Sequence, residues 1–454
     1  MLTQREYMQV KLHCVTIEDL VPMDHFLRKL AALIDFSFIY DVVRKLYCDN
    51  NGRPGIDPVV LVKYLLVGFL YGIESERRIE QEIRVNMAYR WFLGLDIGDR
   101  IPDHSTISQL RRRKFNGADL FKELFVHVLR LCVEAGLVSG KLLLTDSTHV
   151  KANATKMAKV TVEIEQDMTE YFERLDAYEA EERERLGMPG ITRKPPAPKK
   201  VKKSVSVTDP ESGWLKRPNK PEGFHYLTHQ TIDAQNGIII DVAVTAGNTS
   251  DNVPYLDQID RCEELLNVMN IEIEGVCADS AYDTALIHKK METRDITIYT
   301  PEKETSDSTK VEYKREDFNY NKETDKFTCP NGETLKLSSL QRSETGVYRE
   351  YRSDPKICKH CPDCGKCLAP SQKSRKIQVN IFQDIVDKHH EADGSEEYNA
   401  ALRQRQILCE GTFASQKEHH NLKRLFRRGL QAAEDHCLLS ATAINLKRMV
   451  RCMG

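Results

Sequence analysis

The sequence predicts an α/β fold with a mixed sheet, flanked by helical regions on both sides. Short apolar runs typical of buried strands occur at 141–146, 273–279 and 296–300. Residues 226–233 and 238–245 alternate or run apolar on either side of Asn236-Gly237, which predicts a β-hairpin. Helices are expected at about 252–270 and 285–293. The hairpin is antiparallel and the helical crossovers imply parallel strands, so the sheet is expected to be mixed.

The composition is that of a soluble, globular protein. The chain has 454 residues, which is enough for about three domains. Hydrophobic residues make up 41% and charged residues 30%, which argues against a disordered chain. The longest apolar run, Val59–Ile73, is short for a membrane span and contains Lys63. The N-terminus is polar and lacks a signal-peptide core, so we expect an intracellular protein without a membrane segment.

Charge is distributed unevenly along the chain. The net charge of −2 does not by itself indicate a nucleic-acid partner. Acidic residues concentrate at 163–184, however, while lysines and arginines concentrate at 193–203 and 403–428. An average over these segments hides a basic surface.

Residues 1–135 are predicted to be mostly helical. Apolar residues at mixed spacings of three and four indicate helices at Val59–Ile73 and Arg77–Leu95. The turn Gly52–Pro58 leads into the first of these, with Asp57 as its N-cap and Pro58 at the first helical position.

A third helix is expected to begin near Asp103 or Ser105 and to end in basic residues. These residues are Arg111, Arg112 and Arg113. Short helices that end in a basic one suit a helix-turn-helix-like DNA-binding domain. A helical bundle with a solvated basic end fits the spacing equally well.

Residues 155–187 are predicted to form a long helix. Apolar residues in steps of four and three form a narrow seam at Ile164, Met168, Tyr171, Leu175 and Tyr178. Such a seam is typical of a coiled coil or helical arm, and a dimer contact is one role open to it. The following run, 193–203, is rich in proline and lysine and is expected to be an exposed linker.

Three acids stand where metal chemistry is expected. Asp146 and Asp279 each follow a short apolar run, so both are predicted at carboxyl ends of strands, where ligands bind in open α/β sheets. Glu410 lies on a predicted helix, with Lys417 two turns further along the same face, roughly 10 Å away. Carboxylates are the hard ligands that two Mg²⁺ ions roughly 4 Å apart need for phosphodiester chemistry. From spacing alone, ordinary strand-end residues and a solvated helix residue remain the alternative.

Longer motifs surround these acids. They are Thr145-Asp146-Ser-Thr-His-Val-Lys-Ala-Asn153, Ala278-Asp279-Ser-Ala-Tyr282-Asp283, and Cys409-Glu410-Gly-Thr-Phe413 followed by Lys417, Arg427-Arg-Gly429 and Glu434. In this order they resemble the three motifs of bacterial insertion-sequence transposases of the DDE superfamily. Segments 21–28, 52–58, 75–78, 89–95 and 102–108 are similar to the helical domain that precedes the catalytic core of these enzymes.

The resemblance implies an RNase H-like core with a mixed five-stranded sheet. It also implies a division of the chain into parts. These parts are an N-terminal helical DNA-binding domain (1–135), the first part of the catalytic core (136–154 and 205–301), a helical arm with a basic linker inserted after the first strand (155–204), a small Cys-rich β insertion (302–390), and a C-terminal helical part of the core that carries the catalytic Glu (391–454).

The resemblance further implies a DNA transposase. Asp146, Asp279 and Glu410 would hold two Mg²⁺ ions, for which Mn²⁺ substitutes, and the enzyme would cut DNA and transfer strands at terminal inverted repeats. Its partners would be transposon ends and target DNA, bound by a homodimer in the bacterial cytoplasm and nucleoid. There is no Walker motif, so no nucleotide cofactor is expected. An RNase H-like nuclease without strand transfer and a catalytically inactive, transposon-derived DNA-binding protein are the alternatives.

The third motif departs from one large branch of the family, which has Tyr-x2-Arg-x3-Glu-x6-Lys. Gln406 stands where that Arg is found and Arg403 where the Tyr is found, while Lys417 fits. The role of the Arg is therefore left open between Arg403 and Arg405. Ala281 replaces the usual Gly of the second motif.

Gly247-Asn248-Thr-Ser-Asp251 resembles a loop that follows the third core strand in this family. Asp251 either orients a ligand or water near the catalytic acids or caps the helix that follows. The sequence favours the capping role, because Asp is a common N-cap residue.

Basic residues in three regions are candidates for phosphate contact. They are Arg111, Arg112 and Arg113, the run at 193–203, and Arg403, Arg405, Lys417, Arg424, Arg427 and Arg428. Phosphate contacts of this kind make binding strongly dependent on salt. For any one of these residues the alternative is a solvated charged face.

Five of the thirteen cysteines crowd into one segment. They are Cys329, Cys358, Cys361, Cys364 and Cys367, with His360 among them. Cys-x2-Cys pairs each supply two ligands to a tetrahedral Zn²⁺, so a structural zinc site is expected. Five cysteines overfill one site, so the four ligands cannot be chosen from the sequence. A reduced cysteine-rich loop and, less in keeping with the rest of the chain, an iron–sulfur cluster are the alternatives.

Overall fold

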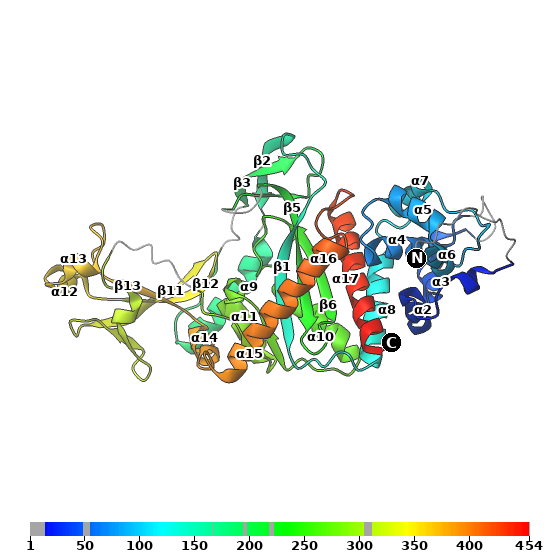
Figure 1. Ribbon diagram of the computed structural model, residues 1–454. Helices are drawn as coiled ribbons and strands as arrows, with labels where there is room; N and C mark the ends of the chain where they lie inside the picture. The colour runs from blue at the N-terminus through cyan, green and yellow to red at the C-terminus, as the bar shows by residue number, and fades with distance from the viewer. Residues whose placement is uncertain are drawn as a thin grey trace, which may run out of the picture. The chain divides into compact units, whose positions relative to one another are not determined.

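The computed structural model describes residues 14–48, 55–166, 168–193, 198–217, 222–303 and 311–453 (Figure 1). Residues 52–54 of the predicted turn and 194–197 of the basic run lie outside the described residues. Contacts divide the chain into two compact units. The first combines 1–160, 205–273 and 403–454, and the second combines 161–204 and 274–402.

Helices fill the N-terminal part of the first unit, as predicted. They are α1 (Ile17–Leu20), α2 (Phe26–Leu33), α3 (Phe38–Val43), η1 (Arg44–Leu46), α4 (Pro58–Leu70), α5 (Glu76–Val85), α6 (Met87–Leu93), α7 (His104–Arg113) and α8 (Leu120–Glu134). Asp57 caps α4 by accepting from the amide of Val59 at 2.7 Å, and Pro58 is the first helical residue, as the sequence indicates.

The predicted helix at 77–95 is two helices in the structure. Asn86 ends α5 and caps α6, because its side chain accepts from the amides of Ala88 and Tyr89. The helix expected near 103 is confirmed as α7, with Asp103 as its N-cap.

The long C-terminal helix α17 (Leu430–Met453) forms the centre of the first unit's helical core. Figure 1 shows it beside α8, and it also packs against α4, α2 and strand β6 (Ile239–Ala246). Most of its side chains from Ala432 to Leu446 are buried, which explains its apolar composition. Among the described residues, no helix is both long enough and apolar enough to cross a membrane.

The strands of the first unit are antiparallel neighbours of β5 (Gly223–Asp233). One edge of β5 pairs with β1 (Leu143–Lys151), and the other pairs with β4 (Gly213–Leu215) and β6. All eleven residues of β5 are buried, as expected for a strand covered on both faces. The predicted hairpin of β5 and β6 is confirmed, with Gly237 at φ +72° in the turn.

Strand β1 is longer than the sequence predicts. Pairing with β5 continues from Leu143 opposite Asp233 to Lys151 opposite His225. Asp146 therefore lies inside the strand and not at its carboxyl end, so that prediction was wrong. The residues after Asp146 are mostly polar, so the sequence does not predict a strand there. Pairing with the fully buried strand β5 extends β1 through them.

Helix α10 (Tyr255–Val268) follows β6, and Pro254 is its N-cap. Strands β7 (Gly275–Cys277) and β8 (Thr297–Tyr299), which belong to the second unit, pair in parallel. The described residues of 136–154 and 205–301 thus form six strands (β1, β4, β5, β6, β7 and β8) where five were predicted. The extra strand is β4, which has only three residues and no apolar alternation to reveal it.

The remaining elements of the second unit differ more from the prediction. Residues 159–166, expected to be helical, form β2 (Lys159–Gln166), which pairs with β3 (Lys199–Ser206). Helix α9 (Thr169–Arg185) begins only after it, so Ile164 does not belong to the helical seam. The alternation in Lys-Val-Thr-Val-Glu-Ile-Glu, residues 159–165, has period two and favours a strand.

The seam of α9 is occupied within the second unit. Leu175 is buried against Leu340, Val347 and Ile381, and Tyr171 and Tyr178 pack at the edge of this cluster. The predicted availability of this seam for a dimer was therefore wrong for Leu175, which is 1% exposed.

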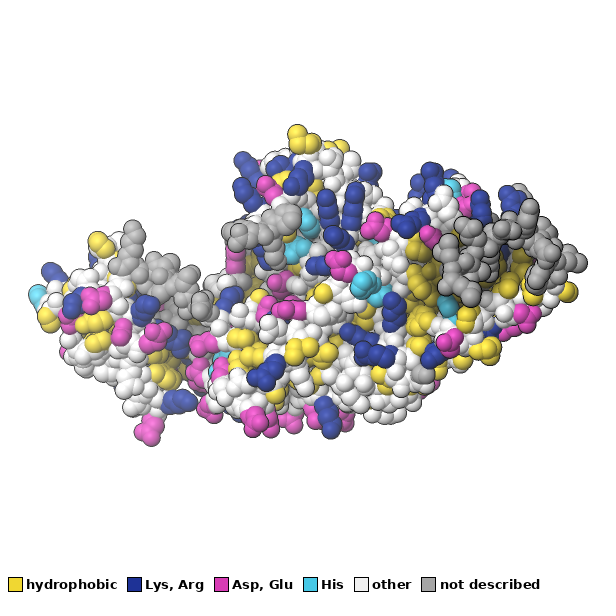
Figure 2. All heavy atoms as spheres, viewed as in Figure 1, with side chains coloured by type: hydrophobic (Ala, Val, Ile, Leu, Met, Phe, Trp, Pro, Cys, Tyr) yellow, Lys and Arg dark blue, Asp and Glu magenta, His cyan; other side chains and the backbone are white. Residues whose placement is uncertain are grey.

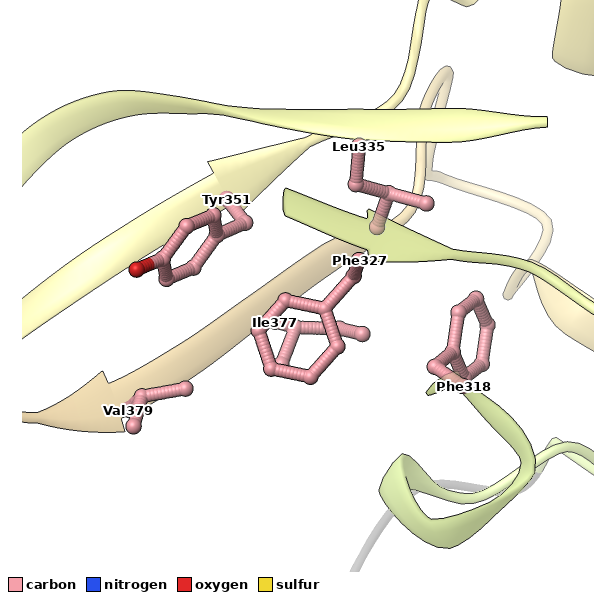
Figure 3. Close-up of a cluster of buried hydrophobic side chains, with 6 residues drawn as sticks. All are labelled: Phe318, Phe327, Leu335, Tyr351, Ile377 and Val379. Atoms are coloured by element: carbon pink, nitrogen blue, oxygen red, sulfur yellow. The ribbon is translucent and has the colours of Figure 1, made fainter. Parts of the chain in front are cut away.

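The cysteine-rich segment contains an antiparallel sheet with its own core. Its strands, β9 (Asn319–Asn321), β10 (Lys326–Thr328), β11 (Thr334–Ser343), β12 (Gly346–Arg352) and β13 (Lys376–Asn380), are arranged in the order β13-β12-β11-β10-β9. Figure 3 shows the buried cluster of this core, which is formed by Phe318, Phe327, Leu335, Tyr351, Ile377 and Val379.

Short helices occupy the chain between β7 and α17, some of them among the strands of this sheet. They are η2 (Ser280–Tyr282), α11 (Ala285–Thr293), η3 (Arg315–Asp317), α12 (Pro355–Lys359), α13 (Cys364–Cys367), α14 (Gln383–His390), α15 (Glu396–Arg405), the π-helical turn η4 (Gln406–Glu410) and α16 (Gly411–His419). The boundary between the two units falls within α15.

Candidate active site

Asp146 points from the middle of β1 toward residues of the C-terminal helices of the first unit. Its Oδ1 accepts from the amide of Ser147 at 2.8 Å, and its Oδ2 lies 3.7 Å from Nη1 of Arg405. The Asp146 side chain is 18% exposed and that of Arg405 is 14% exposed. Partial burial reduces solvent screening, so this ion pair interacts more strongly than one on the surface.

Arg403 and Arg405, between which the third motif leaves the Arg role open, differ in their surroundings. Arg405, the last residue of α15, reaches Asp146, whereas Arg403 is exposed. A guanidinium beside a carboxylate can also contact a phosphate oxygen through its other N–H groups.

Glu410 ends the π-helical turn η4, which packs against β1. Its side chain is exposed. Single π-helical turns inside α-helices occur frequently at functional sites, because the extra residue changes which side chains face a neighbour. This turn was not predicted from the sequence.

Lys417 extends the same arrangement along β1. Its Nζ donates to Oγ1 of Thr148 at 2.6 Å. Thr148 follows Asp146 by two residues, so both side chains project from one face of the strand. Thr148 is not among the predicted site residues, although it lies two residues after Asp146 in the first motif and this spacing predicts that both side chains share one strand face.

Asp251 does not cap α10, so the favoured prediction was wrong. The N-cap is Pro254, and Asp251 Oδ1 instead accepts from Oγ of Ser147 at 2.8 Å. This contact joins Asp251 to the residue that follows Asp146. The other role considered for it, orienting groups near the catalytic acids, agrees with this position.

Asp279 belongs to the second unit, whereas Asp146 and Glu410 belong to the first. It follows β7 by two residues, so its predicted place after a strand is confirmed. Its Oδ1 accepts from the amide of Ala281 at 2.8 Å and thereby caps η2. Ala281 is not among the residues with positive φ, so replacement of the usual Gly costs the turn no strain.

The predicted phosphate contacts differ in accessibility. Arg111 is 6% exposed and its Nη1 lies 2.6 Å from Glu76, so it is occupied in the core and that prediction was wrong. Arg112 and Arg113 are exposed beside it.

Three further arginines follow α16. Arg424 is exposed, and the exposed Arg428 donates from Nε to the carbonyl of Asn153 at 3.1 Å. Arg427 is 3.3 Å from Asp435, and burial lowers its pKa. Arg427 is therefore partly committed to an internal ion pair.

All five clustered cysteines line one cavity of about 650 Å³ in the second unit. The amide of Glu333 donates to Sγ of Cys329 at 3.3 Å, and Nδ2 of Asn331 donates to Sγ of Cys361 at 3.1 Å. Among the described residues, no three of these cysteines have sulfur atoms that all lie within 4.8 Å of one another. Burial raises the pKa of Cys367 to about 11.

Two family models match the chain. The model described as a transposase domain (DUF772) matches residues 15–113, and the model described as a transposase DDE domain matches residues 328–450. The chain thus carries a transposase domain in each of these two ranges, the second of the DDE type. The second match of this transposase includes Glu410, Lys417 and the cysteine segment, but neither Asp146 nor Asp279.

Solved structures similar to the transposase have low sequence identity. The piggyBac transposase in a synaptic complex with hairpin DNA is 10% identical, with a TM-score of 0.38, and the match covers 94% of this chain and 75% of that one. The Mos1 transposase in a paired-end complex is 12% identical, with a TM-score of 0.17, covering 56% and 61%. The family assignment does not rest on either of them. Curated proteins gave no match.

Proposed function

We propose that this transposase cuts DNA at the terminal inverted repeats of an insertion sequence and joins the ends to target DNA. Asp146, Asp279 and Glu410 would bind two Mg²⁺ ions on an RNase H-like core. The observation that carries the proposal is the cationic setting of Asp146, with Arg405 at 3.7 Å and Lys417 bonded to Thr148 on the same strand face. Cations beside a metal-binding carboxylate can bind the DNA phosphate and hold it close to the metal ions.

The acids fit the metal in their chemistry. Mg²⁺ prefers carboxylate oxygens and water, and no thiol or imidazole is needed. When bound, the two ions activate the attacking oxygen and stabilise the leaving oxygen. The chain's own residues would place the phosphate through Arg405 and Lys417, while Asp251 fixes Ser147 next to Asp146.

Basic side chains on separate elements are proposed to bind the DNA backbone. Figure 2 shows Lys and Arg side chains gathered over the region of β2 and β3 and over α5 and α7. Exposed members of these sets include Lys199, Lys200 and Lys202 on β3 and Arg112 and Arg113 on α7. Backbone contacts of this kind are independent of sequence and weaken as salt rises.

The cysteine segment is proposed to hold a structural Zn²⁺. The five cysteines line one cavity, and N–H groups of Glu333 and Asn331 donate to the sulfurs of two of them. Four Cys thiolates are a common ligand set for a structural Zn²⁺. Binding would draw four of the sulfurs together. A homodimer bound to DNA, and a bacterial cytoplasmic and nucleoid location, likewise remain proposals.

The test is cleavage and joining by the purified full chain on DNA that carries the element's own ends, with Mg²⁺ or Mn²⁺. Asp146→Ala, Asp279→Ala and Glu410→Ala should each lower the rate about a thousandfold or more, because several kcal/mol of charge stabilisation is lost. Glu418→Gln, an exposed acid on α16, is the matched control and should cut normally. Cleavage that survives in the alanine variants would refute the proposed triad.

The same assay separates the alternatives. Cleavage without joining would identify a nuclease without strand transfer. Binding of the ends without cleavage by the unmodified chain would identify a catalytically inactive DNA-binding protein.

A further inference from the structure

A second cluster of metal-ligand side chains lies within the second unit, apart from the three acids and the cysteines. Asp283 follows η2, His288 is on α11, and His390 ends α14. Oδ1 of Asp283 lies 2.8 Å from Nε2 of His288 and 3.1 Å from Nε2 of His390. The three ligand atoms all lie within 4.8 Å of one another. His288 is 1% exposed, so the cluster is shielded from bulk water.

Each histidine has a partner at its outer ring nitrogen. Nδ1 of His390 lies 2.8 Å from a carboxylate oxygen of Asp393. Nδ1 of His288 lies 2.9 Å from Nδ1 of His389, whose Nε2 is 3.1 Å from Glu292. Histidines that bind metals almost always donate their outer N–H to a carboxylate, a carbonyl or water, and Asp393 is such a partner for His390. For His288, the ring of His389 connects the outer nitrogen to the carboxylate of Glu292.

The carboxylate is oriented as well. Oδ2 of Asp283 accepts from the backbone amide of Lys303 at 2.8 Å. Only Oδ1 therefore faces the two imidazoles. The ligand atoms of the three side chains therefore face one another. A main-chain amide orients Asp283, and contacts at the outer ring nitrogens orient the two histidines.

The hydrogen bonds around Asp283, His288 and His390 favour an ion between these three side chains. Without one, His390 needs a proton on both nitrogens to donate to Asp283 and Asp393. The chain from Asp283 through His288 and His389 to Glu292 likewise needs one doubly protonated ring, because a neutral imidazole has one donor and one acceptor.

A divalent cation replaces both extra protons with no change in total charge. With the ion bound to the inner nitrogens, His390 donates to Asp393, His288 donates to His389, and His389 donates to Glu292. Every ring is then neutral and every contact pairs a donor with an acceptor.

We propose that Asp283, His288 and His390 bind one divalent transition-metal ion of the zinc class. Two imidazoles and one carboxylate suit Zn²⁺ better than Mg²⁺, which prefers oxygen ligands. Three protein ligands leave a fourth position for water. The ion would connect three segments, of which the first lies four residues after Asp279, and it would hold the turn that carries this acid.

A matched control exists in the first unit. Glu80, Asp103 and His104 also bring their ligand atoms within 4.8 Å of one another. Nε2 of His104, however, lies 3.5 Å from Nε of Arg77, which is a donor. The outer nitrogen of this ring therefore accepts from a cation instead of donating to a carboxylate, so the group differs from the proposed site at this position.

The experiment measures Zn²⁺ bound per full-length chain in competition with a chromophoric chelator, in excess Mg²⁺. His288→Gln combined with His390→Gln should remove one tightly bound ion relative to the unmodified chain, and His104→Gln should remove none. Ions held by the cysteines are common to all three proteins and cancel in the comparison. Equal Zn²⁺ binding by the double variant and the unmodified chain would overturn the proposal, as would displacement of the ion by Mg²⁺.

A milder variant guards against loss of folding. Asp393→Ala leaves the three ligands in place and removes the acceptor behind His390. It should raise the Kd for Zn²⁺ roughly 10-fold to 100-fold. An unchanged Kd in this variant, with an unchanged circular dichroism spectrum, would show that the outer contact does not serve a metal and would count against the site. Substitution by Co²⁺ should give a spectrum without thiolate bands from the ion that the double variant loses.

Discussion

Buried histidines have opposite surroundings in the two units. In the first unit His420 donates to the carbonyl of Phe69 and His436 to the carbonyl of Asn421, each at 2.7 Å. Burial lowers the pKa of both histidines to about 4, so both rings are neutral near pH 7. They join helix α4 to the C-terminal segments without bringing charge into the core.

In the second unit the acceptors are carboxylates. Hydrogen bonds to Asp283 and Asp393 raise the pKa of His390 to about 9 in the metal-free protein. A carbonyl acceptor leaves a buried ring neutral, whereas a pair of carboxylates calls for a cation. At His390 the hydrogen bonds to carboxylates outweigh the effect of burial on the pKa, whereas at His420 and His436 the carbonyl acceptors do not.

Acid should test this comparison most strongly. Below pH 6.5 the unfolded chain protonates His420 and His436, whereas the folded state resists until about pH 4, so the first unit loses stability as pH falls through this window. The loss is at most about 1.4 kcal/mol per pH unit for each histidine. Both tryptophans, Trp91 and Trp214, lie in the first unit, so their fluorescence during urea unfolding reports on it.

The double variant His420→Asn, His436→Asn is the control for that experiment. It should be less stable at pH 7 and should show a flatter dependence on pH. Arg111 and Arg427 near His436, and Lys447 and Arg448 near His420, oppose protonation in the folded state as well. An unchanged slope in the double variant would assign the acid sensitivity to other groups.

Leu335→Ala should destabilise the second unit by about 2–5 kcal/mol, because Leu335 is fully buried in the same cluster as Phe327 and Tyr351 (Figure 3). Differential scanning calorimetry measures the change. The tryptophan transition should stay in place if the two units unfold independently. A tryptophan transition that shifts with the calorimetric one would show that the units unfold together.

Arg405→Ala should slow DNA cleavage about 10-fold to 100-fold, equivalent to roughly 1.4–2.7 kcal/mol. The reason is that Asp146 loses the cation 3.7 Å away that is proposed to hold phosphate. Rates at saturating DNA, measured beside Arg403→Ala, check this. Equal effects of the two substitutions would reject the special role of Arg405.

Asp57→Ala should have the smallest effect, about 1 kcal/mol, because α4 loses an N-cap. Asp57 also accepts from the hydroxyl of Tyr40 at 2.7 Å, and Tyr40→Phe removes that contact alone. Urea unfolding followed by tryptophan fluorescence measures both variants. If Tyr40→Phe costs as much as Asp57→Ala, the cap itself contributes nothing.

Local rules predicted the parts of the fold that local forces decide. Helix α11 has the predicted bounds, and Asp57 and Asp103 cap helices as expected, because capping depends on residues within one turn. The bounds of β1 were predicted wrongly because the buried partner β5, some eighty residues later in the chain, extends it past the apolar run.

The candidate site divides in the same way. Motifs were enough to find the three acids and Lys417, but not the contacts of their neighbours. Arg111 looks like part of a basic helix end until its partner Glu76 is located. Asp251 looks like an N-cap until Ser147, a hundred residues away in sequence, is found beside it.

The π-helical turn at 406–410 determines whether Arg405 and Lys417, which both contact β1, project from the same side of the helix axis. Lys417 follows Arg405 by twelve residues, and at about 100° per residue a regular α-helix would turn them about 120° apart. The π turn absorbs one residue, which brings them within about 20° of each other. That agrees with their contacts, since Arg405 reaches Asp146 and Lys417 reaches Thr148 on a single strand face. Loss or gain of one residue in this turn would leave composition and hydrophobicity almost unchanged and still rotate one cation away from its partner.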